Sequence, residues 1–557
     1  MTPADLQTSL HALATALVER RREQGDEVSI ELSPADVVIE RPKLREHGDW
    51  ASSIALRLAK PLGTPPRKIA DELAAGLGEV PGVASVEVAG PGFINVRLEA
   101  GAAGALARTI VEAGGAYGSG DSLAGRVVNL EFVSANPTGP LHMGHTRWAA
   151  LGDSLGRVLR AAGARVATEF YINDAGNQMD RFAASVLAAA TGAPAPEGGY
   201  SGPYIDDLAR QVLEEHPGLE GLPADEQLVT ARETAYRIQL DEIRASLERF
   251  NVHFDVWFSE RALHAPGEGG RSAIDLAVDR LREQGHVFDE DGAVWVRTTD
   301  FGDDKDRVIR RANGVYTYFA ADAAYYLDKG DRGFEHKIYL LGADHHGYVH
   351  RLKALAGAAG DDPERDIEVL IGQLVSVNGA RLSKRAGNII ELDDLQAWLG
   401  TDALRYTLAR SPADSPLAID PEQLQRRTND NPVFYVQYAH ARTAAVARNA
   451  ASVGVDRSTF VPELLEHESE SALLGALQEF PRIVAQAAEL REPHRIARYI
   501  EELAGLFHRW YDNCRVLPLG DEPVGDLQRT RLWLNDATGV VLRNGLGLLG
   551  VSAPERM

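Results

Sequence analysis

Two histidines stand three positions apart, where an apolar segment gives way to a helical pattern. His142 and His145 belong to the string HMGH, which follows the apolar run 126–133 and a loop rich in proline and glycine. A helix N-terminus offers unpaired N–H groups and a partial positive charge, which suits a phosphate. Residues at i and i+3 share one face of the first turn, and Gly144 allows a nucleotide to approach the backbone closely. The pattern predicts a nucleotide-binding site rather than a metal pair, because a metal needs further ligands and none is evident nearby.

A second charged string, RLSKR, follows the last predicted strand of the parallel-sheet pattern. Lys384 lies within it, between Arg381 and Arg385. Negative charge grows on a departing phosphate group, and cations aimed at that group stabilise the transition state. The string therefore predicts a cationic contribution to nucleotidyl transfer, chiefly from Lys384, and a solvated basic loop is the alternative interpretation.

The segments around these strings indicate a doubly wound α/β sheet. Residues 126–133 are nearly continuous in apolar residues, as in a buried parallel strand, and the helical pattern after the histidines ends at a glycine cap. Strand, glycine–proline loop and helix in this order open nucleotide-binding sheets of this class. Further strand units recur at 164–174, 336–347 and 367–377.

The length predicts several domains, since 557 residues at roughly 150 per domain give three or four. We expect a small α+β unit over residues 1–115, a catalytic α/β domain over 116–425 and a helical bundle over 426–557. Within the catalytic domain we expect a long, helical and acidic insertion near 180–300, and strands should stop near residue 420.

Composition excludes several classes of protein. Lysine and arginine number 58 and aspartate and glutamate 81, a net charge of −23 that argues against a non-specific nucleic-acid coat protein. The single cysteine, Cys514, rules out an intrachain disulfide and a zinc site built from cysteines, which points to the cytosol or to a redox-indifferent compartment. No apolar run approaches the roughly 18 residues of a membrane span, and the first 26 residues lack the pattern of a signal peptide.

Longer strings in the chain resemble one family. HMGH resembles the HIGH signature of class I aminoacyl-tRNA synthetases, and the string EFVSANPTGPLHMGHTR over 131–147 resembles the version found in arginyl-tRNA synthetases. RLSKR occupies the place of the KMSKS signature, with Arg381 where the first lysine is usual. The resemblance continues through YINDAGNQ (171–178), GVYTYFAADAAYYLDK (314–329), IYLLGADHHGYV (338–349) and RLSKRAGN (381–388), and it covers nearly the whole chain.

The resemblance implies an activity, its substrates and the roles of the domains. A member of this family activates L-arginine with ATP and Mg²⁺ to arginyl-adenylate and then charges tRNA(Arg), typically only when the tRNA is bound. The C-terminal helices would bind the anticodon and the N-terminal unit the tRNA elbow. The protein would work in the cytoplasm, away from membranes, and we expect a monomer.

The resemblance also assigns residues to roles. His142, His145 and Lys384 would be catalytic. ATP would be bound by these three residues together with Gly144, Gly342, Asp344 and Arg381. Arginine would be bound by Glu131, Asn136, Tyr318, Asp322 and His345, with the last not separable from His346. No protein ligand for a metal is expected.

The arginine-binding assignments have physical support and rivals. A guanidinium is a planar fork of donors that keeps its charge, so its pocket should present fixed carboxylates. Tyr318 and Asp322 lie four apart on a predicted helix and so share a face. Asp322 could instead form a surface ion pair with Lys329 or Arg332, and Glu131 could be an ordinary acid at a strand end.

A basic and aromatic segment opens the C-terminal bundle. Residues 426–450 hold four arginines against one acid, together with several aromatic side chains. Cations neutralise phosphates and aromatic rings stack on unpaired bases, which is how single-stranded RNA is bound. The candidate tRNA contacts are Arg426, Tyr435, Tyr438 and Arg442, and the alternative is that the aromatic side chains form the bundle core.

Rival functions explain less of the chain. A small nucleotidyltransferase that never meets RNA would account for HMGH but leave both terminal units unused. A non-catalytic synthetase-like binding protein would be favoured by the loss of either signature, and both are present. Cysteinyl enzymes need zinc-binding cysteines, and glutamyl or glutaminyl enzymes need no acidic side-chain pocket.

Overall fold

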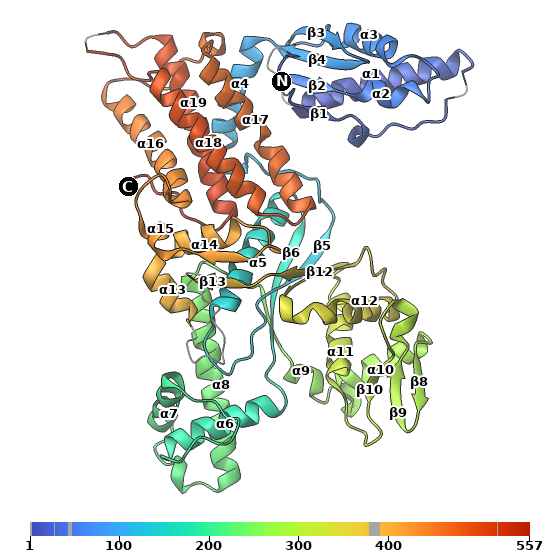
Figure 1. The fold of residues 1–557 in the computed structure, drawn as a ribbon, viewed down its shortest axis with the longest axis vertical. Helices are drawn as coiled ribbons and strands as arrows, with labels where there is room; N and C mark the ends of the chain where they lie inside the picture. Colours follow the sequence, from blue (N-terminus) through green and yellow to red (C-terminus); the bar gives the residue numbers. More distant parts are fainter. Residues whose placement is uncertain (1–2, 27, 43–46, 378–389, 521) are drawn as a thin grey trace.

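The computed structural model describes residues 3–557 apart from 27, 43–46, 378–389 and 521. A small N-terminal unit and a bundle of long helices lie at one end of the molecule in Figure 1. The central strands lie below the bundle, and two lobes extend from them, one around α6 to α8 and one around α10 to α12. The bundle and the two lobes therefore adjoin the central sheet, whereas the N-terminal unit lies beside the bundle.

The N-terminal unit has its own sheet and core. Its four strands are antiparallel in the order β1-β2-β4-β3. The elements are α1 (Pro3–Glu23), β1 (Ile39–Glu40), β2 (Trp50–Ser52), α2 (Ile54–Ala59), α3 (Pro66–Leu77), β3 (Val83–Ala89) and β4 (Phe93–Leu98). The apolar core of this unit runs from Leu6 to Leu98. The next helix, α4 (Ala100–Ala113), packs against the C-terminal bundle instead.

Five parallel strands form the central sheet, as the sequence predicts. Their order is β12-β11-β5-β6-β7, and their bounds are β5 (Val127–Glu131), β6 (Arg165–Ile172), β7 (Val256–Ser259), β11 (His336–Gly342) and β12 (Ile367–Gly372). The chain runs outward from β5 in one direction and returns to its other side at β11, so the order reverses between these two strands. Ligands of open α/β sheets bind at such a reversal, beyond the carboxyl ends of the strands.

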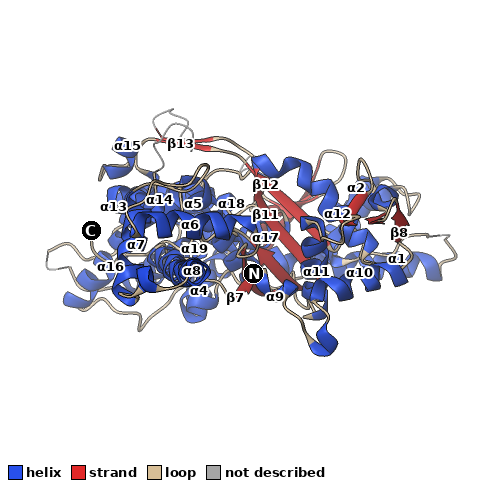
Figure 2. Ribbon diagram, turned by 90° about the horizontal axis from the view of Figure 1, so that it is seen from below, coloured by secondary structure: helices blue, strands red, loops and turns tan. Residues whose placement is uncertain are grey.

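Helices cover both faces of this sheet. In Figure 2, α5 lies on one side of β11 and β12, and α11 and α12 lie on the other. Their bounds are α5 (Met143–Ala161), α11 (Tyr318–Asp331) and α12 (Val349–Ala358). A parallel sheet enclosed in this way is buried on both faces. Val128 and Leu130 on one face of β5 and Asn129 on the other are accordingly buried.

The predicted helical insertion is correct only in its first part. Helices α6 (Asn177–Ala190), α7 (Pro203–Glu215) and α8 (Ala224–Arg249) form it. The chain then returns to the main sheet as β7, and a second lobe follows with α9 (Arg261–His264), α10 (Ala273–Glu283) and the antiparallel strands β8 (Val287–Glu290), β9 (Ala293–Val296) and β10 (Arg307–Arg310). The prediction of helices up to residue 300 is therefore wrong. Each missed strand has only four residues, the shortest run over which an alternating pattern indicates a strand.

The C-terminal part is helical, as predicted. A short parallel pair, β13 (Val375–Val377) and β14 (Leu417–Ile419), frames α13 (Leu392–Leu399) and α14 (Thr401–Ala409). Beyond Ile419 the described chain has no strand, and its α-helices are α15 (Pro421–Gln425), α16 (Pro432–Ser452), α17 (Glu468–Glu489), α18 (His494–Asn513) and α19 (Asp526–Leu548). In the described ranges, no helix is both long and apolar enough to cross a bilayer.

A buried arginine fastens the bundle to the catalytic part. Arg405 of α14 is fully buried and donates to the carbonyls of Phe250 and Leu549, with an ion pair to Asp153 at 2.5 Å. Gly550 lies against this guanidinium, where a Cβ atom would be only 2.1 Å from an Arg405 nitrogen. One side chain thus joins α5, the end of α8 and the end of α19.

Candidate active site

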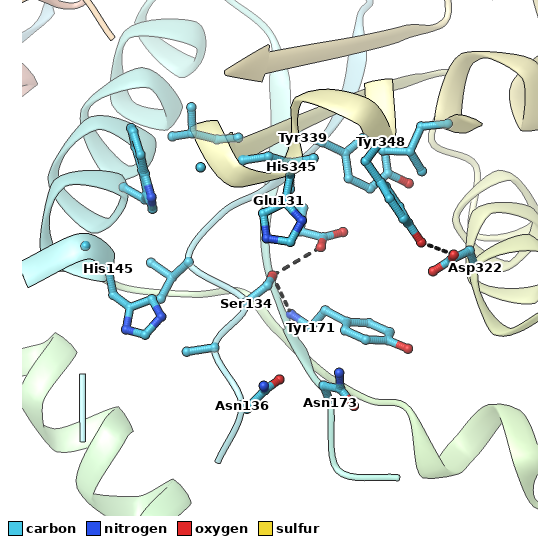
Figure 3. A pocket seen from close by; sticks show the side chains of 18 of the residues that line it. Glu131, Ser134, Asn136, His145, Tyr171, Asn173, Asp322, Tyr339, His345 and Tyr348 are labelled. Carbon is cyan, nitrogen blue, oxygen red and sulfur yellow. Dashed lines mark hydrogen bonds between the residues drawn. The ribbon is translucent and has the colours of Figure 1, made fainter. Parts of the chain in front are cut away.

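A cavity of about 1090 Å³ opens at the carboxyl ends of β5, β6 and β11. The predicted nucleotide-binding residues on its lining are His142, Gly144, His145 and Gly342. The predicted amino-acid-binding residues on its lining are Glu131, Asn136, Tyr318, Asp322 and His345. Residues predicted from separate parts of the sequence therefore share one cavity, which Figure 3 shows from close by.

The histidine pair caps the helix that begins in the cavity wall. His142 is the N-cap of α5, and its Nδ1 accepts a hydrogen bond from the Gly144 amide at 3.2 Å. The two imidazole rings stack with their centroids 3.9 Å apart. A Cβ at position 144 would come within 3.0 Å of the His142 ring, so glycine there keeps the ring in place. The first turn of α5 therefore presents two imidazoles and the positive end of a helix to the cavity.

A strained turn connects β5 to this loop. Val133 and Ser134 both have positive φ angles, 66° and 43°, which non-glycine residues rarely adopt. The turn directs the Ser134 hydroxyl toward Glu131, to which it donates at 3.1 Å, and the same oxygen accepts from the Tyr171 amide (Figure 3). Such strain concentrates at functional sites, and here it fixes the loop between the strand end and the histidines.

The opposite end of the cavity is acidic. Asp322 lies on α11, and the Tyr348 hydroxyl donates to its carboxylate (Figure 3). Burial raises the pKa of Asp322 to about 7, with smaller contributions from the charges of Glu260 and Glu131. The alternative that Asp322 forms a surface ion pair with Lys329 or Arg332 is wrong, because Lys329 pairs with Glu131 and Arg332 with Glu169.

Glu260 is a second acid at this end that the sequence analysis missed. It directly follows β7, only 5% of its surface is exposed, and it lines the same cavity. Burial raises the pKa of Glu260, an effect that the nearby His264 partly opposes. The signal was present in the string FDVWFSE, an apolar run that ends in an acid as β5 does, but it falls inside the expected helical insertion.

Glu131 has a buried cation behind it. The ammonium of Lys329 lies 2.6 Å from one Glu131 carboxylate oxygen, and the Lys329 side chain is fully buried. A carboxylate has about four lone-pair sites, so Glu131 can still accept hydrogen bonds from a ligand. The other predicted polar residue of this strand end, Asn136, donates to the side-chain oxygen of Gln178 on α6 at 2.9 Å.

Some predicted residues fall outside the described part of the structure. Arg381 and Lys384 lie in the undescribed segment 378–389, so their positions stay predictions. Asp344 lies in the short 3₁₀ helix Ala343–Tyr348 beside the cavity, and its side chain is outside the described set.

The candidate tRNA contacts lie on the C-terminal helices, away from the cavity lining. Tyr435, Tyr438 and Arg442 are partly exposed on α16, and Arg426 is exposed at the end of α15. The Arg442 guanidinium lies over the Tyr438 ring, 4.7 Å from its centroid, and donates to its hydroxyl at 2.8 Å. The core positions of α16 include Val436 and Ala439. The tyrosines therefore lie at the edge of the bundle rather than in its centre.

Solved structures of synthetases share this fold. An arginyl-tRNA synthetase from Thermus thermophilus matches with a TM-score of 0.73 at 23% identity, over 98% of this chain and 99% of that chain. A methionyl-tRNA synthetase from Mycobacterium tuberculosis matches with a TM-score of 0.55 at 15% identity, over 77% of this chain and 92% of that chain. At these identities, the matches establish the architecture alone.

Comparisons of sequence identify the family. A family model described as the arginyl tRNA synthetase N terminal domain matches residues 6–98, one for the class I (R) catalytic domain matches 222–408, and one for the DALR anticodon binding domain matches 436–557. Proteins named arginine–tRNA ligase from Renibacterium salmoninarum and Paenarthrobacter aurescens are 63% and 62% identical, over 100% of this chain and of theirs. The chain therefore belongs to the arginyl-tRNA synthetases, a family of class I aminoacyl-tRNA synthetases.

Proposed function

We propose that this arginyl-tRNA synthetase activates L-arginine with ATP in the cavity between α5 and α11, forming arginyl-adenylate and pyrophosphate, and passes the arginyl group to the 3′ end of tRNA(Arg). The observation that carries the proposal is the pair of acids at one end of the cavity, the half-buried Asp322 and the buried Glu260, opposite a helix N-terminus with two histidines. One end of the cavity suits a guanidinium and the other suits phosphates.

The side chain of arginine would bind at the acidic end. Two carboxylates that belong to different elements can each take one edge of the planar guanidinium, and charge-assisted bonds of this kind are the strong ones. The Tyr348 hydroxyl orients the Asp322 carboxylate for this contact. Tyr318, 72% exposed at the rim, would pack against the bound side chain.

The reacting end of arginine would lie over the end of β5. Glu131 and the Asn136 amide oxygen would accept from the α-ammonium, and His345 lines the cavity from the 3₁₀ helix Ala343–Tyr348. The α-carboxylate is thereby directed toward the nucleotide, and holding reactants in such a geometry supplies much of the rate enhancement in reactions of this type.

ATP would bind at the start of α5. An oxygen of the arginine carboxylate attacks the α-phosphorus, the bond to the bridging oxygen breaks, and pyrophosphate leaves with the electron pair. His142 and His145 would stabilise the charge on the phosphate oxygens in the transition state. Gly342 and Asp344 would hold the ribose. Lys384 and Arg381 are proposed, from the sequence, to neutralise the departing pyrophosphate. In the second step the ribose hydroxyl of the tRNA attacks the carbonyl carbon and AMP leaves.

Magnesium would enter with the nucleotide. Among the described residues, no group of three histidine, cysteine or acidic side chains could hold a metal ion. Mg²⁺ commonly keeps its waters and binds through substrate phosphates, and it would offset phosphate charge in this site. The roles in the two reaction steps are those of residues of the chain itself.

The raised pKa of Asp322 predicts how arginine binding depends on pH. Only the ionised carboxylate pairs with the guanidinium, and its pKa is about 7 in the empty pocket. Arginine affinity should therefore fall as pH drops through 7, by about tenfold between pH 8 and pH 6. Calorimetric titration with tRNA present measures this, and Asp322→Asn should flatten the dependence. An affinity that is unchanged at pH 6, or the same slope in the variant, would contradict the assignment.

The terminal units would bind the tRNA. We propose that residues 426–557 bind the anticodon and that the N-terminal unit, up to about residue 115, binds the elbow, in a monomeric cytoplasmic enzyme. The family descriptions of the matched segments support the first role. The aromatic and arginine side chains at the edge of α16 support it as well.

A substitution on α16 tests the anticodon role. Tyr438→Ala removes a ring that stacks with Phe434 and lies under Arg442. We expect tRNA affinity to fall by about tenfold or more, the loss of one aromatic stacking contact, while activation of arginine at saturating tRNA changes less than about twofold. Filter binding and pyrophosphate exchange measure the two effects. Unchanged affinity would make the ring part of the bundle packing alone.

A further inference from the structure

One face of α11 carries side chains that point toward the ends of β5 and β6. Asp322, Tyr325 and Lys329 are spaced by three and four residues, which places them on the same face. Asp322 and Tyr325 line the cavity, whereas Lys329 lies behind it and is fully buried. The Lys329 ammonium contacts Glu131 at 2.6 Å and lies over the Tyr325 and Tyr339 rings, 4.4 and 3.9 Å from their centroids.

A second buried acid repeats this arrangement on the next strand. Glu169 of β6 lies beside Glu131 in the register of the sheet and is also fully buried. Arg332, at the end of α11, holds both Glu169 oxygens at 2.8 and 2.9 Å, and the Tyr325 hydroxyl donates to Glu169 at 2.7 Å. Each buried acid of the strands therefore pairs with one cation from α11.

These pairs hold α11, which carries Asp322, against the strands, one of which carries Glu131. The carboxylates of Asp322 and Glu131 face the cavity from these different elements. Glu131 belongs to the strand end and Asp322 to the helix, and neither Lys329 nor Arg332 lines the cavity. Buried ion pairs contribute little net stability, because desolvation offsets their attraction, but their geometry is fixed and breaking one partner is costly. The network can therefore fix how far α11 lies from the strand ends.

We propose that Lys329 is a positioning residue that sets the separation between Glu131 and Asp322, and with it the length of amino acid that the site accepts. The inference rests on the proposed function, in which Glu131 meets the α-ammonium and Asp322 the guanidinium. Arginine must reach both carboxylates at once. A guanidino acid one methylene longer or shorter carries the same charges, so only this separation distinguishes it.

The test compares three substrates that differ by single methylene groups. They are arginine, homoarginine and 2-amino-4-guanidinobutyrate, each assayed by ATP–pyrophosphate exchange with tRNA present. For Lys329→Met we expect kcat/KM for arginine to fall by about thirtyfold or more, as misplacement of a positioned group does. The kcat/KM for homoarginine should fall much less. The ratio of kcat/KM for arginine to that for homoarginine should therefore decrease by about tenfold.

A matched control exists on the neighbouring strand. Lys337 of β11 is also buried, pairs with Asp361 at 2.6 Å and lies over the Tyr326 ring, but all three are outside the cavity lining. Lys337→Met removes an equivalent pair from the other side of the helix. We expect it to lower the melting temperature as Lys329→Met does and to leave the order and ratios of the three substrates at the wild-type values.

Arg332→Met provides the same test if Lys329→Met does not fold. It removes the ion pair between α11 and β6 and changes no residue of the cavity lining. It should lower the ratio of kcat/KM for arginine to that for homoarginine, as Lys329→Met does. An equal loss for all three substrates, or wild-type ratios in the folded variants, would overturn the positioning role. Wild-type enzyme that showed no exchange with arginine would instead overturn the proposed function, so the two failures are distinguishable.

Discussion

Replacing Asp322 with asparagine should reduce kcat/KM for arginine by at least about a hundredfold at pH 8, which corresponds to about 2.7 kcal/mol of transition-state stabilisation. The substitution keeps the shape of the side chain and removes the charge that opposes the guanidinium. A hydrogen bond to a charged group contributes about 1.5–3 kcal/mol. The lost bond is expected at the upper end of this range because the site is buried and a guanidinium left facing an amide is poorly compensated.

The matched control is Asp331→Asn on the same helix. Asp331 is exposed and pairs with Arg280 at 2.7 Å, so its loss should change kcat/KM less than about twofold. Pyrophosphate exchange with tRNA present measures both variants. A near-normal value for Asp322→Asn would remove that residue from the arginine pocket, and Glu260 alone would then have to hold the guanidinium.

Replacing His142 with asparagine should lower kcat for adenylate formation by about a hundredfold while the affinity for ATP changes less than about threefold. Loss of a donor that acts on the transition state has this magnitude and this signature. Asparagine is chosen because it is also a good N-cap, so it can replace the contact that His142 makes to the Gly144 amide. The substitution then separates the role of the imidazole in catalysis from its role in starting α5.

Two further variants complete this experiment. His142→Ala removes the cap as well and should lose about 1 kcal/mol of stability beyond the asparagine variant. His346→Ala removes an exposed histidine that is outside the cavity lining, and its kcat should stay near the wild-type value. If His142→Asn weakened ATP binding as strongly as it slowed the reaction, the imidazole would be a ground-state contact.

The sequence predicts the parts of this protein whose signals are long or chemically distinctive. The apolar run before the histidines predicts β5, and the strand–loop–helix order predicts the parallel sheet that the structure contains. The four-residue spacing of Tyr318 and Asp322 predicts a shared helix face, and both residues lie on α11 and line the cavity, while the role of Asp322 stays a prediction. Both are local patterns, which a sequence displays directly.

The missed features depend on contacts between distant segments. Glu260 follows a strand of only four residues, and its neighbour in the pocket, Asp322, is 62 positions away. Lys329 appears in the sequence as an ordinary charge on a helix and a candidate partner for Asp322, yet it is buried against Glu131, 198 residues earlier. Local periodicity carries no information about such partners.

The most direct test of the central claim is ATP–pyrophosphate exchange with each of the twenty amino acids, with and without total tRNA. We expect exchange with arginine and with no other amino acid, and only when tRNA is added. Exchange with arginine in the absence of tRNA would support arginine as the substrate but show that activation does not require tRNA. Exchange with a different amino acid, or with none, would contradict the assignment of the acidic pocket to arginine.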